Sequence, residues 1–227
     1  MDEESVAIVV GAGGALGRAV AIGLAAKGHS VVAVDRNEAG LEQLPDGIRR
    51  EVADATDPAA AAAVVEKIAS EVGPPRVLVN TVGAFALDDL GSATPDALTR
   101  MMDVNLGAAL WLSQAVAPHM RELGSGSIVH VAARNALEAS TGTLTYSLSK
   151  VALAHLVRIL DIELRPAGIR VNAVAPQLLD SPYARASLPP EVVQHAVAPE
   201  AIAEIIVALS GDSTAPVSGA IVPAYGS

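Results

Sequence analysis

The sequence contains no cysteine, few aromatic residues and fewer basic than acidic side chains. Because none of its 227 residues is cysteine, disulfides, thiolate metal sites and a cysteine nucleophile are excluded. Aromatic residues make up 2% of the chain, so the core must be built from alanine, valine, leucine and isoleucine. The five histidines have no paired spacing typical of metal ligands, and we expect no metal site.

The charge balance limits the possible partners. Fifteen basic and 25 acidic residues give a net charge of −10, which disfavours nucleic acid as a partner. No apolar run approaches the ~20 residues of a membrane span, and the acidic start MDEES does not resemble a secretory signal. We therefore expect a cytoplasmic protein with a small-molecule ligand. A phosphate-bearing ligand would need a local device such as a helix N-terminus.

Short β-branched runs alternate with longer segments rich in alanine and leucine. Apolar strands separated by helices favour a parallel sheet covered on both faces. We expect an α/β fold with a doubly wound sheet of seven mainly parallel strands in one domain, 1–227. The predicted strands lie at 6–10, 30–34, within 48–54, and at 76–80, 127–132, 169–176 and 219–223, and the predicted helices at 15–28, 58–72, 94–122, 144–165 and 200–210.

A glycine-rich segment, GAGGALG at 11–17, follows the first predicted strand and leads directly into a helix. Glycine lets a diphosphate approach the backbone, and the helix N-terminus supplies free N–H groups and partial positive charge. The G-x-G-x-x-G spacing fails because Leu16 occupies its last position, whereas a looser pattern ends at Gly17. The segment predicts a nucleotide cofactor; the alternative is a glycine turn that serves packing alone.

Asp35 ends the second predicted strand, where a carboxylate can accept hydrogen bonds from an adenosine ribose and repel a 2′-phosphate. This favours NAD(H), but Arg36 follows at once and can reach a 2′-phosphate, so NADP(H) remains possible. A helix or turn cap is the alternative role for Asp35. Asp54 can accept from an adenine amino group, or it is a solvated turn residue.

Tyr146 and Lys150 are four residues apart on one predicted helix and therefore share a face. A phenol with a pKa of ~10 is a poor acid or base near neutrality. A nearby ammonium, together with oxidised nicotinamide, favours phenolate and lowers that pKa. Asn105 lies within a predicted helix, where asparagine is unfavourable. This suggests a buried amide that anchors a relay water, or else a satisfied core residue.

Over nearly its whole length the chain resembles the short-chain dehydrogenase/reductase family, whose fold is Rossmann-like. The resemblance is carried by GAGGALG (11–17), Asp35, Asp54, NTVG (80–83), Asn105, GSIVHVA (126–132), YSLSK (146–150), IRVNAVAP (169–176) and SGAIVPAYG (218–226). It implies a nicotinamide cofactor and hydride transfer, with Tyr146 as the general acid/base. It also implies that Lys150 binds the nicotinamide ribose and that Asn105 holds the relay water.

The expected cofactor site comprises Gly11, Gly13, Gly14, Ala15, Leu16, Gly17, Asp35, Arg36, Asp54, Ala55, Asn80, Val82, Gly83, Tyr146, Lys150, Pro176 and Ser181. Within it, Asn80 and Gly83 would shape the loop beside the adenosine. Ser181 stands where the family often has a threonine that contacts the nicotinamide amide.

The main departure from the family is Ala133, which occupies the position of the family's catalytic serine. Loss of one such hydrogen-bond donor typically costs ~3 kcal/mol of transition-state stabilisation. Another group must compensate, or the substrate does not need that donor. The polar residues that follow in the same loop, as candidates or as ordinary loop residues, are Asn135, Ser140, Thr141 and Thr143.

Three expectations stay open. The segments 132–150 and 178–189 are similar to the dihydropteridine reductase branch, which lacks this serine and has an aromatic residue near Phe85; core packing is the alternative for Phe85. A nucleotide-binding sensor or scaffold without turnover is a second possibility, suggested by Ala133. The family resemblance also implies a homodimer or homotetramer formed through the helices near 95–122 and 144–165.

We expect the substrate site to include Phe85, Ala133 and Asn135, with a short substrate loop at 178–195.

Overall fold

Seven strands pair in one sheet in the order β3-β2-β1-β4-β5-β6-β7, and the pairs are parallel throughout the described chain. The structure is a computed structural model that describes residues 5–226. The strands are β1 (Val6–Val10), β2 (Ser30–Asp35), β3 (Arg49–Val52), β4 (Pro75–Asn80), β5 (Gly126–Val131), β6 (Ile169–Pro176) and β7 (Ile221–Ala224). The predicted Rossmann-like α/β fold is confirmed. The strand order reverses between β1 and β4, where such sheets leave a crevice for ligands.

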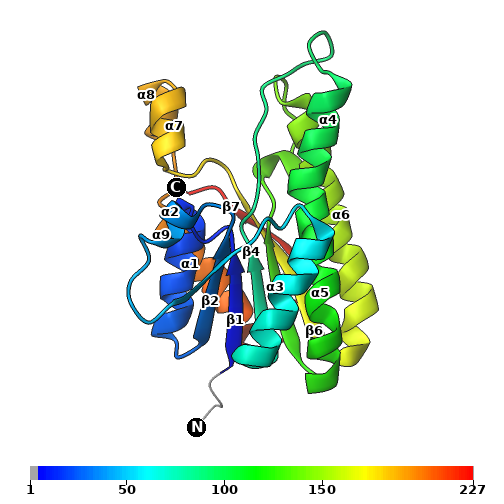
Figure 1. Ribbon diagram of the computed structural model, residues 1–227. Helices are drawn as coiled ribbons and strands as arrows, with labels where there is room; N and C mark the ends of the chain where they lie inside the picture. The colour runs from blue at the N-terminus through cyan, green and yellow to red at the C-terminus, as the bar shows by residue number, and fades with distance from the viewer. Residues whose placement is uncertain (1–4, 227) are drawn as a thin grey trace.

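Helices cover both faces of the sheet (Figure 1). One face carries α3 (Pro58–Glu71), α5 (Ala108–Leu123) and α6 (Leu144–Leu164), and the other carries α1 (Ala15–Ala26), α2 (Glu38–Leu41) and α9 (Pro199–Ser210). The remaining helices lie beyond the carboxyl ends of the strands: α4 (Pro95–Met102), α7 (Pro182–Ser187) and α8 (Pro190–Val193).

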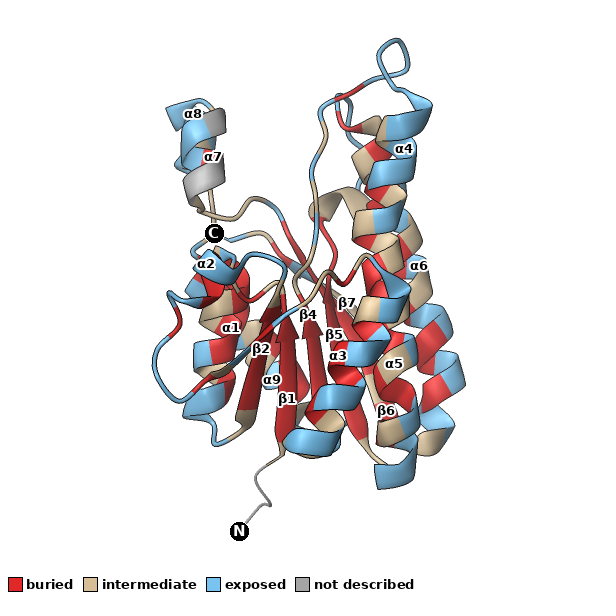
Figure 2. Cartoon of the chain, in the orientation of Figure 1, coloured by how far each residue is buried: buried red, intermediate tan, exposed pale blue. Residues whose placement is uncertain are grey.

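The sheet separates two apolar clusters, and β1 and β5 near its centre are buried along their whole length (Figure 2). Ile8 and Leu112 belong to the cluster under α3, α5 and α6, whereas Val9 and Ile202 belong to the cluster under α1 and α9. Successive residues of β1 therefore point to opposite clusters. This explains why the strand is apolar at every position instead of alternating.

The helix predicted over 94–122 is found, but its α-helical geometry is interrupted. It begins as expected, with the Thr94 hydroxyl oxygen accepting from the Ala97 N–H at 3.1 Å and with Pro95 in the first turn. A π-helical turn, η1 (Asp103–Gly107), then separates α4 from α5. Its wide turn brings the side chain of Asn105 into a fully buried position.

The predicted substrate loop at 178–195 contains two short helices, α7 and α8, which the sequence analysis missed. They stand away from the body of the molecule, opposite the segment that leads into α4 (Figure 1). Ser181 caps α7, because its hydroxyl oxygen accepts from the Ala184 N–H at 3.1 Å. In this structure the side chain is thus occupied by the local backbone.

Candidate active site

Two adjoining cavities lie at the carboxyl ends of the strands. One, of about 400 Å³, is lined by the glycine loop, the ends of β2 and β3, and the segment after β4. The other, of about 570 Å³, is lined by the loops after β4, β5 and β6 and by α6 and α7. They share the lining residues Arg36, Thr81, Gly83, Ala84 and Arg100. The predicted nucleotide and catalytic ends are therefore brought together in one continuous site.

The glycine loop is held so closely to its neighbours that larger residues do not fit at two positions. Gly11 has φ +82°, and a Cβ there would lie 2.5 Å from the Thr81 hydroxyl oxygen. A Cβ on Gly17 would lie 2.2 Å from the carbonyl oxygen of Gly11. At Gly14, by contrast, a Cβ would meet nothing closer than 3.4 Å. Packing thus explains Gly11 and Gly17, but it does not explain Gly14.

Gly14 is the N-cap of α1, and no side chain caps this helix or places an acid in its first turn. Gly14 also lines the first cavity. The exposed helix N-terminus therefore offers N–H groups and positive potential to an anion there, and the loop fits a diphosphate. Of the other predicted loop residues, Leu16 and Gly17 are buried in the protein, and Gly13 and Ala15 lie outside both cavities.

The carboxylate of Asp35 ties the glycine loop to the end of β2. Its oxygens accept from the N–H groups of Gly13 and Asn37, each at 2.9 Å. The cap role considered for Asp35 is therefore present in the structure. The residue still lines the first cavity, together with Arg36, Asp54 and the buried Ala55.

Asp54 and Arg36 form an exposed ion pair of 3.7 Å at the mouth of the first cavity. Hydrogen bonds from the N–H and hydroxyl of Thr56, followed by the charge of Arg36, hold the pKa of Asp54 below its usual value. An exposed ion pair of this kind contributes about 0–1 kcal/mol and is readily exchanged for a ligand contact.

Tyr146 and Lys150 both line the second cavity, as their spacing on α6 predicted. The rings of Phe85 and Tyr146 pack edge to face, with their centroids 4.8 Å apart. Phe85 is 42% exposed, so it belongs to the cavity wall and not to the core. The Lys150 ammonium lies 5.9 Å from the Tyr146 ring centroid and donates to the carbonyl oxygen of Val131 at 2.9 Å.

The expected lowering of the tyrosine pKa is not found in the protein alone. Burial raises the pKa of Tyr146 to about 12 and lowers that of Lys150 to about 8. Desolvation is the cause of both shifts. The ammonium of Lys150 donates to the carbonyl oxygen of Val131. In the protein alone, the charge of Lys150 does not bring the pKa of Tyr146 below its ordinary value, so a bound positive charge would have to add to it.

The side-chain amide of Asn105 forms hydrogen bonds to the loop after β4 through both its oxygen and its nitrogen. Its Oδ1 accepts from the Ala84 N–H at 2.9 Å, and its Nδ2 donates to the Ala84 carbonyl oxygen at 3.0 Å and to the Ser149 hydroxyl at 2.9 Å. Both amide hydrogens are thus engaged by protein groups. A relay water would have to use the second lone pair of Oδ1.

Ala133 and Asn135 line the second cavity, with Ala133 almost fully buried. The Asn135 Nδ2 lies 2.7, 3.0 and 3.2 Å from the hydroxyl oxygens of Ser140, Thr143 and Ser147. None of these hydroxyls lines the cavity, and neither does Thr141. Among the four candidates for the missing hydrogen-bond donor, the structure therefore brings only Asn135 into the cavity with Tyr146.

Several residues escaped the sequence analysis. Arg100 lines both cavities from α4. The second cavity is also lined by Gln177 and by three leucines on either side of α7, Leu178, Leu179 and Leu188. Pro176, which was predicted, lines it too. The buried Asp88 accepts from the N–H and hydroxyl of Thr145, one residue before Tyr146. Nothing in the local pattern signals a contact between loops so far apart in the chain.

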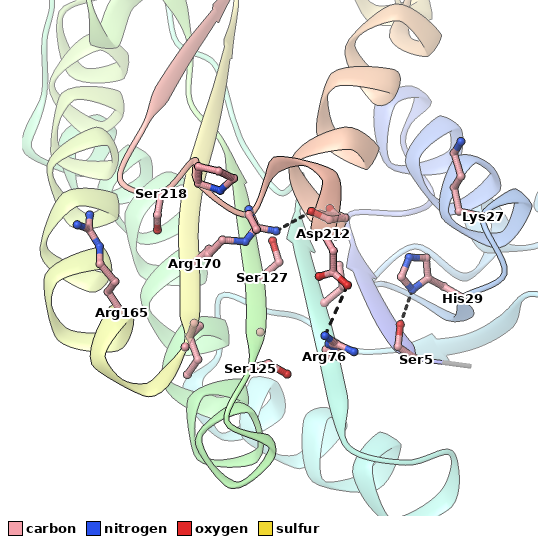
Figure 3. Close-up of a pocket in the computed structure, with 18 of the residues that line it drawn as sticks. Ser5, Lys27, His29, Arg76, Ser125, Ser127, Arg165, Arg170, Asp212 and Ser218 are labelled. Carbon is pink, nitrogen blue, oxygen red and sulfur yellow. Dashed lines mark hydrogen bonds and ion pairs between the residues drawn. The ribbon is translucent and has the colours of Figure 1, made fainter. Parts of the chain in front are cut away.

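A further hollow of about 710 Å³ lies at the opposite, amino-terminal edge of the sheet (Figure 3). It is lined by basic residues, but the protein itself engages several of them. Arg170 donates to the carbonyl oxygens of Gly211 and Val217, Arg165 pairs with Asp161, and Arg76 lies 3.8 Å from Asp212. None of the predicted site residues lines this hollow.

Across the described part of the chain, no helix has the length and apolar character needed to cross a membrane. Within the same residues, no group of three or more histidine or acidic side chains is arranged to hold a metal ion.

Comparisons with known proteins agree with this geometry. The family model described as short chain dehydrogenase matches residues 5–191. A short-chain reductase protein, NovJ, from Streptomyces niveus is 38% identical over 192 residues, which cover 80% of this chain and 72% of that protein. The cis-4-hydroxycyclohexanecarboxylate dehydrogenase of Sinomonas cyclohexanicum is 32% identical over 239 residues, or 98% and 96% of the two chains.

The crystal structure of gox2181 superimposes with a TM-score of 0.92 at 25% identity and covers 98% of this chain and 94% of that one. The chain is an NAD(P)-dependent oxidoreductase and belongs to the short-chain dehydrogenase/reductase family.

Proposed function

We propose that this protein transfers a hydride between a nicotinamide cofactor and a small carbonyl, alcohol or C=N substrate. One observation carries the proposal: the cavity that contains Tyr146 and Lys150 adjoins the cavity at the glycine loop and the N-terminus of α1. The dehydrogenase from Sinomonas, named for a cyclic hydroxy acid, supports the carbonyl/alcohol class. The nicotinamide, when bound, supplies or accepts the hydride.

The residues of the chain then have distinct roles. The N-terminus of α1 binds the diphosphate, and Asp35 accepts hydrogen bonds from the adenosine ribose. Tyr146 donates or removes the proton at the substrate oxygen or nitrogen, and the positive charge of Lys150 favours its phenolate form. Asn105 fixes the backbone at Ala84, which lines both cavities.

The position of Asp35 supports a preference for NADH over NADPH. Its carboxylate lines the first cavity, where it would repel a 2′-phosphate. Arg36 can leave the exposed carboxylate of Asp54 and pair with that phosphate, so NADPH is expected to bind more weakly than NADH but measurably. Titration of both cofactors tests the order, and tighter binding of NADPH would reverse it.

Asn135 is the group we propose in place of the missing serine hydroxyl. It has the position, because it lines the cavity beside Tyr146, and the neighbouring hydroxyls hold its amide in place. The oxygen and nitrogen of an amide are assigned from their partners, and hydroxyls can serve either atom. An amide turned to present its N–H groups to the cavity would supply the donor that Ala133 lacks.

A second candidate substrate class is favoured by Phe85, whose ring packs on Tyr146 beside Ala133. A flat, conjugated C=N compound such as quinonoid dihydropterin could stack on this aromatic edge and needs one proton, which Tyr146 can supply. Fast NADH oxidation with the pterin and slow oxidation with ketones would support this class.

Tyr146→Phe tests the proposed function. We expect turnover to fall by about 10²–10⁴, while the Kd for NADH stays within about twofold, because only the proton donor is removed. Stopped turnover with retained binding would agree with the proposal. A wild-type protein that binds neither NADH nor NADPH would refute it. Binding without turnover on a broad panel of carbonyl and imine substrates would instead support a nucleotide-binding sensor.

The exposed apolar side chains of α6 support a homodimer or homotetramer. Leu148, Val151, Ile159 and Ile162 are all at least 41% exposed, and Ile162 is 74% exposed. An apolar helix face of this kind is typical of a surface that a second subunit covers. This helix is one of the two that the family resemblance implied for assembly.

A further inference from the structure

A buried histidine that the proposed reaction does not use lies directly behind the cofactor loop. His130, on β5, has no exposed surface. Its Nε2 lies 3.1 Å from the Ser113 hydroxyl of α5, and its Nδ1 lies 3.5 Å from the Asn80 amide nitrogen at the end of β4. The imidazole thus connects α5 to the end of β4, and residues that follow β4 line both cavities.

The hydrogen atoms of this cluster can be assigned by counting donors. The Ser113 hydroxyl donates its one hydrogen to the carbonyl oxygen of Ala109 at 2.7 Å, so it must accept from the His130 Nε2–H. Burial, with a further contribution from the charge of Lys150, lowers the pKa of His130 to about 3. The ring is therefore neutral, and its Nδ1 is an acceptor.

The same count fixes the amide of Asn80. Its Oδ1 accepts from the Val82 N–H at 3.0 Å, which leaves its Nδ2 to donate to the bare Nδ1 of His130. The hydrogen bonds then all run in one direction, from the Val82 N–H through Asn80, His130 and Ser113 to the carbonyl oxygen of Ala109 as the last acceptor. A chain with this single direction has no alternative arrangement unless the imidazole changes its tautomer or takes up a proton.

The end of this chain is the backbone that the cofactor must meet. Val82 lines the first cavity and Gly83 lines both. A Cβ on Gly83 would lie 3.1 Å from the Asn105 Oδ1 and 3.3 Å from the Lys150 Nζ, so the loop has little room to shift. Lys150 is itself bonded to the carbonyl oxygen of Val131, the residue after His130.

We propose that neutral His130, in its Nε2–H tautomer, is a positioning residue that sets the Val82–Gly83 backbone for cofactor binding through the amide of Asn80. This inference rests on the proposed nicotinamide site. It assigns to His130 no contact with cofactor or substrate. Its effect is therefore expected on the affinity for NADH more than on kcat.

Histidine-selective ¹⁵N NMR tests the chain without any activity. With His130→Asn to assign the signal, we expect neutral Nε2–H shifts for His130 that persist at pH 5, where an ordinary histidine is mostly protonated. A signal for the Nδ1–H tautomer, or a titration near pH 6.5, would overturn the proposal. This readout remains valid even if the protein turns over no substrate.

A matched pair of serine variants tests the functional part. Ser113→Ala removes the acceptor of the Nε2–H, whereas Ser127→Ala removes a buried hydroxyl on the same strand as His130 that bonds to the carbonyl oxygen of Leu209. We expect the Kd for NADH to rise about tenfold in Ser113→Ala and to stay within about twofold in Ser127→Ala. Equal effects in the two variants, or no effect in Ser113→Ala, would contradict the proposal.

Failure of this proposal differs from failure of the proposed function. A wild-type protein with no affinity for NADH or NADPH would remove the proposed function itself. Retained wild-type affinity with no difference between Ser113→Ala and Ser127→Ala would remove only the role of His130.

Discussion

Asp88 and Thr145 join two segments 57 residues apart, because the carboxylate of Asp88 accepts from both the N–H and the hydroxyl of Thr145. The backbones of the two segments are hydrogen-bonded as well: the Asp88 N–H donates to the carbonyl oxygen of Gly142, and the Asp88 carbonyl oxygen accepts from the Leu144 N–H. Thr143, the N-cap residue of α6, makes no side-chain cap, so Asp88 performs this function from a distant loop. The first turn of α6, which carries Tyr146, is thus fixed by a residue outside the helix.

Replacing Asp88 should therefore affect both folding and turnover. We expect Asp88→Ala to lower the free energy of unfolding by about 1–3 kcal/mol, because it leaves buried donors without partners. Turnover should fall as well, since Tyr146 loses its fixed position. Asp89→Ala is the control, because the exposed Asp89 bonds only within its own turn, to Gly91 and Ser92. Denaturant unfolding and initial rates measure the two effects, and similar losses in both variants would contradict this role.

Substitutions at Gly14 and Gly17 should separate an effect on cofactor binding from an effect on packing. Gly17→Ala should prevent stable folding, since its Cβ would overlap the carbonyl of Gly11. Gly14→Ala has space in the protein and a φ of −81°, so only about 1 kcal/mol of stability should be lost at the N-cap. Its methyl group would nevertheless occupy the surface that we assign to the diphosphate. We expect NADH binding, measured by calorimetry, to weaken at least tenfold, and unchanged binding would place the diphosphate elsewhere.

Lys150 should cost stability while it serves the reaction. Burial lowers the pKa of Lys150 from 10.5 to about 8, so the charged form is less favourable in the folded protein than in the unfolded chain. Between pH 8 and 10.5 the unfolded chain binds more protons, and the contribution of this residue to stability rises with pH across that window.

Lys150→Met should accordingly stabilise the protein at pH 7 by roughly 1–2 kcal/mol, after allowance for the hydrogen bond to Val131 that is lost. Turnover should be lost in the same variant. A lower midpoint of thermal unfolding than in the wild type would show that the buried ammonium stabilises the fold.

His130 should make the fold sensitive to acid. Its pKa is lowered from 6.5 to about 3, so the unfolded chain binds more protons between these values. The stabilising contribution of the neutral ring is complete above pH 6.5 and is lost as the pH falls toward 3, with a limiting slope of about 1.4 kcal/mol per pH unit. Lys150 is the charged group that adds to this shift. His130→Asn should flatten the acid limb of a stability profile measured by urea unfolding, and an unchanged slope would exclude this origin.

The exposed face of α6 should determine the state of association. Ile162→Glu places a charge on a side chain that is 74% exposed, so a folded monomer should tolerate it. We expect light scattering to detect smaller particles than for the wild type, because a buried charge in a subunit interface is unfavourable. The same substitution at the more distant Val52, 56% exposed on β3, should leave the particle mass unchanged.

The sequence was most informative where one short segment carries both a pattern and its chemistry. β1, the glycine loop and α1 follow each other directly, and the spacing of Tyr146 and Lys150 on one helix was enough to place both in one cavity. The clamp by Asp88 could not be predicted, since its partner lies in another loop. The wide turn at Asn105 could not be predicted either, because an apolar pattern of helical period continues through it.

Polar residues outside these patterns were equally hidden. His130 lies within an apolar strand, and only the packing of α5 brings the Ser113 hydroxyl to it. Arg100 is an ordinary exposed residue of α4 until the fold brings α4 alongside both cavities. Contacts between separate elements, and not local preferences, decide the role of such residues.

The π turn before α5 gives the chain an unusual dependence on residue count. Deleting Asp103, which precedes Asn105, would restore a uniform α-helix, the more favourable backbone geometry, without removing any side chain of the proposed chemistry. The residues that follow would then rotate by about 100° relative to α4, and Asn105 could no longer hold Ala84 by both its N–H and its carbonyl. In this region, the number of residues therefore matters as much as their identity.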